Sequence, residues 1–369
     1  MNAKVNGATA ARFLVLTPAI DGADGISELS RQVVGSLVRG AGAGHVDVWA
    51  LDGGPPRGLA AASFWTASGS RFRFVRRAMA RAARGCEDLD VIVLHAHLAP
   101  LAHVMGRRGA RVAAFLIGVE VWKPLRARER RAIGHANRLI AISEFTARGF
   151  RDANPTLAAR RVTVCAPGIG AAPATHPATT DGGFALIVGR LSSDERYKGH
   201  DALIDIWPAV RAAVPAARLV VAGDGDDRGR LEALVASRGL SDAISFTGRV
   251  DDTALASLYA GSAFFVMPSA REGFGLVYLE AMRAGKPCVA VHGSADEIIR
   301  HGIDGLIVDR DSPAQLAAAI VHLYSDGDRR KLMGASACAR VLDAFAEEVF
   351  DRRFLEAIGA PVLATATTP

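Results

Sequence analysis

The chain has 369 residues, of which half are hydrophobic, so it can bury a large core and its length favours two domains. No stretch approaches the ~18–20 uninterrupted apolar residues of a membrane span, which argues against an integral membrane protein. The four cysteines are scattered without pairing, which argues against a disulfide framework or a zinc motif.

The net charge of +6 is distributed unevenly along the chain. Through residue 175 there are 24 Lys and Arg and 12 Asp and Glu, giving +12; the remaining 20 and 26 give −6. A basic half would attract an anionic membrane surface or a diphosphate-bearing acceptor. The alternative, that arginine merely fills ordinary surface positions, stays open.

Apolar strands alternate with amphipathic helices from one end of the chain to the other. This pattern predicts repeated βα units, and therefore two doubly wound, Rossmann-like α/β domains with ligands at the carboxyl ends of their strands. A Pro/Thr/Gly-rich linker follows residue 171, and a last helix is predicted at about 335–357. The predicted strands are 12–16, 45–51, 91–95, 112–117, 138–142 and 162–166 before the linker, and 184–188, 218–222, 244–247, 263–267, 288–291 and 305–308 after it.

Glycines follow the first predicted strand and precede a helix over 26–38. Gly22 and Gly25 allow another group to approach the backbone closely at this junction, although such a junction is weak support for a function alone. Further along, His95 and His97 are predicted to alternate on one strand and share a face. Zinc would need a third ligand at suitable spacing, and His103 does not provide one, so we favour a pair that lines a cleft.

Residues 71–84 carry six arginines and no acidic residue. A helix here would place Arg73, Arg77, Arg81 and Arg84 on one face, and Phe72, Val75 and Met79 on another. Such a helix can lie on an anionic bilayer surface. It could equally pack against the core with a solvated outer side.

The segment after the strand 263–267 carries the strongest indication of function. Glu272 follows that strand on a loop, Gly273 and Gly275 leave backbone N–H groups open at a helix start, and Glu280 lies more than one turn further on. Amides at a helix start favour a phosphate, and the carboxylates can hold sugar hydroxyls. Together they predict a nucleotide-sugar site.

The region 184–309 resembles the C-terminal half of retaining GT-B glycosyltransferases of family 4, the glycosyl transferases group 1, which include bacterial mannosyltransferases. The resemblance covers this half strongly and the N-terminal half weakly. It rests on an intact Glu-x7-Glu motif and on several further blocks in the family order: Gly189-Arg190-Leu191, Tyr197-Lys198-Gly199, Gly223-Asp224-Gly225, Gly248-Arg249-Val250, Met267-Pro268-Ser269 and Glu280-Ala281-Met282.

The resemblance implies roles for individual residues. Arg190 and Lys198 would neutralise the leaving diphosphate, Glu272 would face the donor sugar, and Glu280 would hold the ribose. Val250 would contact the base, and Gly25 would approach the donor phosphates. Catalysis is therefore assigned to Glu272, Arg190 and Lys198, and donor binding to Gly25, Arg190, Lys198, Val250, Glu272, Gly273, Phe274, Gly275 and Glu280, with no metal site.

One block departs from the family pattern. Many members have a histidine followed by a glycine and an acidic residue; Gly118 and Glu120 fit, but Ile117 stands where the histidine is expected. Isoleucine can neither bond to a sugar hydroxyl nor accept a proton. In the mechanism that the resemblance implies, the leaving phosphate takes the acceptor's proton, and Glu120 could supply the missing polar contact.

The sequence therefore predicts a GT-B protein with domains at 1–175 (acceptor) and 176–345 (nucleotide sugar) facing a central cleft, and a returning helix and tail at 346–369. The predicted activity moves a hexosyl group, with mannose favoured, from a GDP- or UDP-sugar to a lipid-linked or saccharide acceptor, with retention and without a metal or other cofactor. A cytoplasmic location is expected, with peripheral contact to the inner face of the plasma membrane and no nucleic-acid partner. Two alternatives stay open: a catalytically weak nucleotide-sugar-binding subunit and a nucleotide-sugar epimerase.

Overall fold

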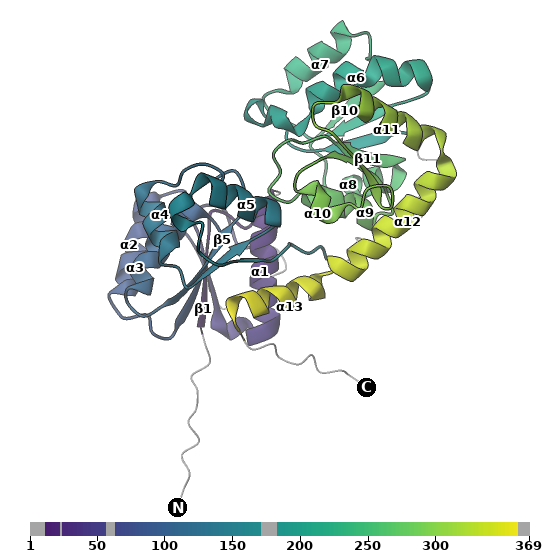
Figure 1. Cartoon of the computed structure of the whole chain (residues 1–369). Coiled ribbons are helices and arrows are strands. Elements are labelled where there is room, and N and C mark those ends of the chain that lie inside the picture. The colour runs from purple at the N-terminus through teal and green to yellow at the C-terminus, as the bar shows by residue number, and fades with distance from the viewer. Residues whose placement is uncertain (1–11, 23, 57–62, 171–182, 361–369) are drawn as a thin grey trace, which may run out of the picture. The chain divides into compact units, whose positions relative to one another are not determined.

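The computed structural model describes residues 12–22, 24–56, 63–170 and 183–360. Two compact units are present: unit 1 combines 1–168 with 347–369, and unit 2 spans 169–346 (Figure 1). The predicted linker after residue 171, including the proposed boundary at 175, and the end of the tail lie outside the described residues.

Unit 1 is built on a parallel sheet of seven strands in the order β3-β2-β1-β4-β5-β6-β7. Helices α2, α3 and α4 follow one another on one side of this sheet, while α1 and α13 lie together on the other (Figure 1). The strands are β1 (Arg12–Thr17), β2 (Val46–Ala50), β3 (Ser63–Thr66), β4 (Leu89–Val93), β5 (Arg111–Leu116), β6 (Arg138–Ala141) and β7 (Val162–Val164). The helices are α1 (Gly25–Ala41), α2 (Arg71–Ala82), α3 (Ala99–Gly106), α4 (Ala127–Gly134), α5 (Glu144–Ala153) and α13 (Glu347–Ile358), with 3-10 turns η1 (Ala43–His45), η2 (Ala96–Leu98) and η3 (Pro155–Leu157).

Unit 2 contains a second parallel sheet, of six strands in the order β10-β9-β8-β11-β12-β13. Its central strands are buried on both faces, which explains why they read as uninterrupted apolar runs. The strands are β8 (Ala185–Val188), β9 (Leu219–Ala222), β10 (Ile244–Gly248), β11 (Phe264–Met267), β12 (Cys288–Val291) and β13 (Gly305–Val308). The helices are α6 (His200–Ala213), α7 (Arg228–Ser237), α8 (Asp252–Gly261), α9 (Leu276–Arg283), α10 (Ala295–Ile298), α11 (Pro313–Ser325) and α12 (Gly327–Ala344), preceded by the 3-10 turn η4 (Ser193–Lys198).

These two sheets confirm the prediction of two doubly wound, Rossmann-like domains. All strands expected from the sequence are present to within a few residues. The short edge strand β3 was not predicted. It pairs only with β2 among the described strands and is half-exposed, so it lacks the apolar run that marks a buried strand. Within the described residues, no helix combines the length and the apolarity that crossing a membrane requires.

Two predictions about local structure are wrong. His95 and His97 do not alternate on a strand: β4 ends at Val93, and the His95 ring accepts a hydrogen bond from the His97 backbone N–H, which starts the turn η2. The helix predicted over 335–357 is broken into α12 and α13. The break occurs because Phe345 is buried and its carbonyl accepts a hydrogen bond from the Ile169 N–H, so the backbone there is engaged outside the helix.

Candidate functional site

The loop between β11 and α9 has the conformation that the sequence predicts. β11 is entirely buried, and α9 starts directly after Gly275. Gly275 has φ +104°, and a Cβ there would lie 2.6 Å from the Tyr278 ring, so this turn requires glycine. Phe274 is buried against Phe345, with ring centroids 5.9 Å apart, so of Phe274 only the backbone is left for a ligand.

Glu272 and Lys198, separated by 74 residues in the sequence, form an ion pair. The Lys198 Nζ lies 3.2 Å from the Glu272 Oε1, which also accepts a hydrogen bond of 3.0 Å from the Ser269 hydroxyl. Only 16% of the Lys198 side chain is exposed, so solvent screens this pair less than an ordinary surface pair. The lysine is therefore held in a defined position before any ligand is bound.

Glu195 joins the second cation to the same cluster. Its Oε1 accepts a 2.5 Å hydrogen bond from Arg190, and its Oε2 lies 4.0 Å from the Lys198 Nζ. That Oε2 is buried, and no group of the described residues forms a hydrogen bond with it. Tyr197 lies beside the cluster: burial, with smaller contributions from Glu195 and Glu272, raises the pKa of its phenol to about 12. We call Arg190, Glu195, Lys198 and Glu272 the charge cluster.

Glycines after β9 allow the segment that carries Arg190 to lie close by. A Cβ at Gly223 would approach the Gly189 carbonyl oxygen to 1.9 Å, and one at Gly225 would approach the Leu191 carbonyl oxygen to 2.2 Å. No rearrangement of a side chain could relieve such contacts with backbone. The family block Gly223-Asp224-Gly225 is therefore explained by the close packing of two backbone segments.

A buried aspartate holds the turn η4. Asp227 is 4% exposed and accepts hydrogen bonds from Arg196, within η4, and from Arg230. The Arg230 hydrogen bond, followed by the one from Arg196, lowers the pKa of Asp227 to about 2, despite the opposing effect of burial. Asp227 thus stays ionised at neutral pH and fixes the turn that contains Glu195 and Lys198.

Glu280 lies on α9 and accepts a hydrogen bond of 2.7 Å from the Tyr259 hydroxyl. Tyr259 is almost fully buried, and burial, followed by the charge of Glu280, raises the pKa of its phenol well above the ordinary value. The tyrosine therefore acts as a neutral donor that orients the carboxylate. The sequence did not predict a role for Tyr259 or Glu195 in the site. For Glu195, the position three residues before Lys198 could have indicated an ion pair with that lysine.

Two further predicted donor-binding residues, Val250 and Gly25, belong to other elements. Val250 follows β10 in unit 2 and is half-buried. Gly25 belongs to unit 1, where it is the first residue of α1, and the helix is capped by the Asp24 carboxylate. A Cβ at Gly25 would meet nothing within 4 Å, so the fold itself does not require glycine there.

A second group of polar residues follows β4 and β5 in unit 1. The Glu120 carboxylate accepts a 2.8 Å hydrogen bond from the backbone N–H of Ile117, and His97 lies 2.7 Å from buried Glu129. The rings of His95 and His97 are 4.7 Å apart, and burial lowers the pKa of His95. Among the described residues, no three His, Cys, Asp or Glu side chains are placed to hold one metal ion. Glu120 was expected to supply the polar contact that Ile117 cannot make. In the structure its carboxylate is already bonded to the Ile117 backbone.

Comparison with known proteins finds sequence similarity mainly in unit 2. Residues 184–326 match the sequence model of the family described as Glycosyl transferases group 1. A GDP-mannose-dependent alpha-(1-6)-phosphatidylinositol monomannoside mannosyltransferase from Mycobacterium tuberculosis is 37% identical over 147 residues, 38% of each chain. A D-inositol 3-phosphate glycosyltransferase from Thermobispora bispora is 31% identical over 232 residues, 57% of this chain and 53% of that protein.

Solved structures resemble the chain over nearly its whole length. Anabaena HepE in complex with UDP superposes with a TM-score of 0.76 at 19% identity, covering 94% of this chain and 99% of that one. Sucrose-phosphate synthase from Thermosynechococcus elongatus superposes with a TM-score of 0.74 at 20% identity, covering 94% of this chain and 98% of that one. At these identities the likeness establishes the fold alone, which is that of the GT-B glycosyltransferases.

Proposed function

Taking as premise that residues 184–326 belong to the glycosyl transferases group 1 family, we propose that the chain transfers a hexosyl group from a nucleotide-diphosphate sugar. The observation that carries this proposal is the charge cluster, in which Arg190 and Lys198 are brought together by Glu195 and Glu272. The alignments cover 38% of the mycobacterial relative, so its donor, GDP-mannose, supports mannose as the favoured sugar here without fixing it.

The cluster can perform the electrostatic part of such a reaction. When the sugar leaves, negative charge builds on the diphosphate, and fixed cations lower the energy of that state. Arg190 and Lys198 would hold the diphosphate, together with backbone amides at the start of α9. Glu272, oriented by Ser269 and Lys198, would receive hydroxyls of the sugar. Glu280, oriented by Tyr259, would receive those of the ribose.

The proposed reaction retains the anomeric configuration and needs no metal. The bond between the anomeric carbon and the diphosphate oxygen breaks, and the acceptor oxygen forms a bond on the same face. The acceptor's proton passes to the leaving phosphate, so Ile117 need not accept it. Because neutralisation is assigned to two side chains and backbone amides, activity is expected to persist in the presence of EDTA.

A donor panel tests the activity. The purified chain is incubated with radiolabelled GDP- and UDP-sugars and with membranes, and transfer and donor hydrolysis are measured for the wild type and for Lys198→Ala. We expect one donor to be consumed by the wild type and its consumption to fall in the variant. The absence of both transfer and hydrolysis with every donor would overturn the proposal.

The acceptor is proposed to lie at an anionic membrane, because α2 presents an apolar stripe to solvent. Phe72, Val75 and Met79 are 75%, 42% and 50% exposed, whereas the core side of the helix is formed by Phe74, Ala78 and Ala82. Arginines flank this stripe on a helix with no acidic residue. Apolar side chains among arginines favour the interface of an anionic bilayer.

Vesicle flotation tests this surface. Phe72→Ser is expected to weaken binding to phosphatidylglycerol vesicles roughly tenfold or more, because a buried Phe side chain is worth about 1.5–3 kcal/mol. Leu332→Ser is the control, since Leu332 is equally prominent, at 66% exposed, but lies on α12. Equal binding by both variants and the wild type would exclude α2 as the contact.

A weak nucleotide-sugar-binding subunit remains the second candidate, because Ile117 is 9% exposed and Glu120 bonds to its backbone N–H. Isoleucine cannot accept a proton, and one oxygen of the Glu120 carboxylate is already engaged by the backbone. If the wild type binds the donor without transfer and Ile117→His gains transfer, the subunit function is favoured. If the wild type transfers the sugar and Ile117→His shows no further gain in transfer, the enzymatic function is favoured.

A further inference from the structure

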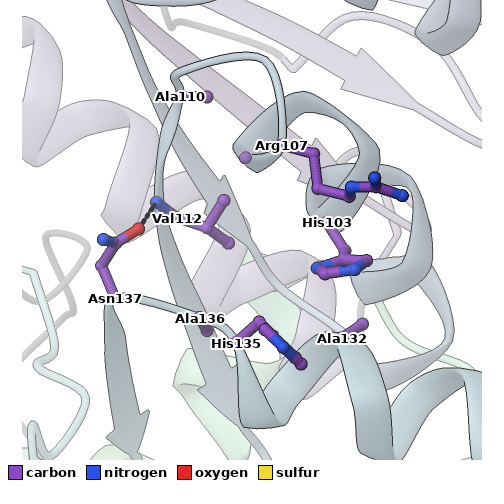
Figure 2. A pocket seen from close by; sticks show the side chains of 9 residues that line it. His103, Arg107, Ala110, Val112, Ala132, His135, Ala136 and Asn137 are labelled. Carbon is purple, nitrogen blue, oxygen red and sulfur yellow. Dashed lines mark hydrogen bonds between the residues drawn. The ribbon is translucent and has the colours of Figure 1, made fainter.

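Unit 1 contains a cavity of about 190 Å³ that none of the proposed steps uses (Figure 2). It lies between the ends of α3 and α4 and the starts of β5 and β6. This is the amino-terminal edge of the sheet, opposite to the edge where His95 and Glu120 follow their strands. A cavity needs roughly 10–15 Å³ to hold one water molecule, so this one has room for a larger ligand. It is lined by His103, Gly106, Arg107, Ala110, Val112, Ala132, His135, Ala136 and Asn137.

The polar lining of the cavity is basic. Figure 2 shows His103 and Arg107 coming from α3 and its end, and His135 from the end of α4. The two imidazole rings are 5.0 Å apart. No carboxylate lines the cavity, and none of the ion pairs of the described residues includes Arg107. The site therefore presents cationic and neutral donors, and the opposing negative charge comes from the carbonyls at the ends of α3 and α4, such as that of Arg131.

The hydrogen bonds already made in the cavity leave donors for a ligand. The His135 Nδ1 lies 2.7 Å from the Arg131 carbonyl, so it carries a proton and leaves the Nε2 for another partner. The Asn137 side-chain oxygen accepts from the Val112 N–H at 2.7 Å, which directs its amide oxygen away from a ligand. Protonated, both imidazoles would offer an N–H that no described acceptor takes up.

We propose that this cavity binds a tetrahedral oxyanion, the chemistry of a phosphate group, through His103, Arg107 and His135. Basic residues in last helical turns are common because they interact well with the helix dipole. That preference places single cations at single helix ends, however, and does not account for three converging on one cavity. The phosphate group could be free or belong to a lipid headgroup; α3 packs directly against α2, the helix proposed to meet the membrane.

Isothermal titration with sulfate tests the site without involving the membrane. Arg107→Glu is expected to weaken sulfate binding roughly tenfold or more, since a charge-assisted hydrogen bond is lost and a repulsion is gained. Arg108→Glu is the matched control: the neighbouring arginine is exposed and does not line the cavity, so its loss should change affinity less than about twofold. Equal losses of affinity in both variants would overturn the proposal. So would the absence of sulfate binding by the wild type at about 10 mM sulfate.

The pH dependence gives a second criterion. Sulfate keeps its charge between about pH 5 and 8, so any change in affinity comes from the protein. Burial lowers the pKa of His103, and three charged groups lower it further: His135 at the end of α4, Arg131 on α4 and Arg107 at the end of α3. Binding of an anion favours the protonated imidazoles, so affinity should rise as the pH falls. In the double variant His103→Gln/His135→Gln this rise should disappear; if it persists, the histidines are not ligands.

Vesicles separate the two sources of the phosphate group. Arg107→Glu and Arg108→Glu are compared for binding to phosphatidylglycerol vesicles and for binding of inorganic phosphate. A loss confined to Arg107→Glu in both assays assigns a headgroup site that also accepts the free anion. A loss of binding in the phosphate assay alone assigns the cavity to a free anion. That assignment stands even if the membrane contact and the transferase activity are both disproved.

Discussion

The basic residues proposed to bind ligands differ between units 1 and 2, although other arginines of unit 1, such as Arg39 and Arg111, do pair with carboxylates. In unit 2, Arg190, Lys198 and Arg230 are all engaged with carboxylates, and the sequence after residue 175 has an excess of acid. In unit 1, the excess is basic, and Arg73 and Arg107 have no acidic partner among the described ion pairs. Paired cations are oriented before a ligand arrives, whereas unpaired ones attract anions with little orientation. The difference suits a precise site in unit 2 and surface binding in unit 1.

Replacing Lys198 should have the largest effect of the variants considered, and it tests the proposed donor site in unit 2 directly. Lys198→Ala should lower kcat/KM by about 10²–10³, the usual result of removing one group that stabilises charge in a transition state. It should also weaken UDP or GDP binding, because Arg190 would be the remaining cation of the charge cluster. Steady-state kinetics and calorimetry measure the two effects.

The control is Lys331→Ala, since Lys331 is an exposed lysine in the same unit. It should leave both quantities unchanged. Nucleotide affinity that is the same in Lys198→Ala and in the wild type would remove the basis of the proposed donor site, and with it the contrast between the two units.

His200 sharpens the comparison because it shows the effect of burial beside the same cations. Burial, followed by the charge of Lys198, lowers the pKa of His200 from 6.5 to about 4. The unfolded chain therefore binds a proton more readily than the folded one. Stability contributed by the neutral imidazole is present above pH 6.5 and is lost as the pH falls toward 4, by up to about 3 kcal/mol.

Urea unfolding at pH 7 and pH 4.5 measures this effect. His200→Leu, which cannot be protonated, should lose less stability on acidification than the wild type, by an amount approaching about 3 kcal/mol. His322→Leu, at an exposed position on α11, should behave as the wild type does. Identical acid sensitivity in all three proteins would contradict the assignment to His200.

The sequence predicts the strands and the segment 272–280 well, because both follow from local order. A buried strand reads as an apolar run, and Gly275 is needed for the turn that starts α9. Contacts between segments that are distant in the sequence are harder to predict. Glu195 meets Lys198 because a 3-10 turn brings them together, and the break between α12 and α13 depends on Ile169, far away in the sequence. The prediction placed His95 and His97 on a strand because no glycine or proline marks the end of β4. The turn after β4 is instead fixed by the His95 side chain, which accepts a hydrogen bond from the His97 N–H.

Tyr259 offers the smallest and most selective test, because its hydroxyl acts on a ligand only through Glu280. Tyr259→Phe removes the 2.7 Å hydrogen bond to Glu280, along with a long 3.5 Å contact to the Val277 carbonyl, so nucleotide affinity should fall by about threefold to tenfold, equivalent to about 1 kcal/mol. Tyr324→Phe is a matched control, since its hydroxyl also makes hydrogen bonds within unit 2, with the backbone of Ala185 and Arg218. Both variants should lose comparable stability to urea, while only Tyr259→Phe should bind nucleotide more weakly. Should affinity fall equally in the two, the effect would come from a general loosening of unit 2, and the orientation of Glu280 by Tyr259 would have no part in donor binding.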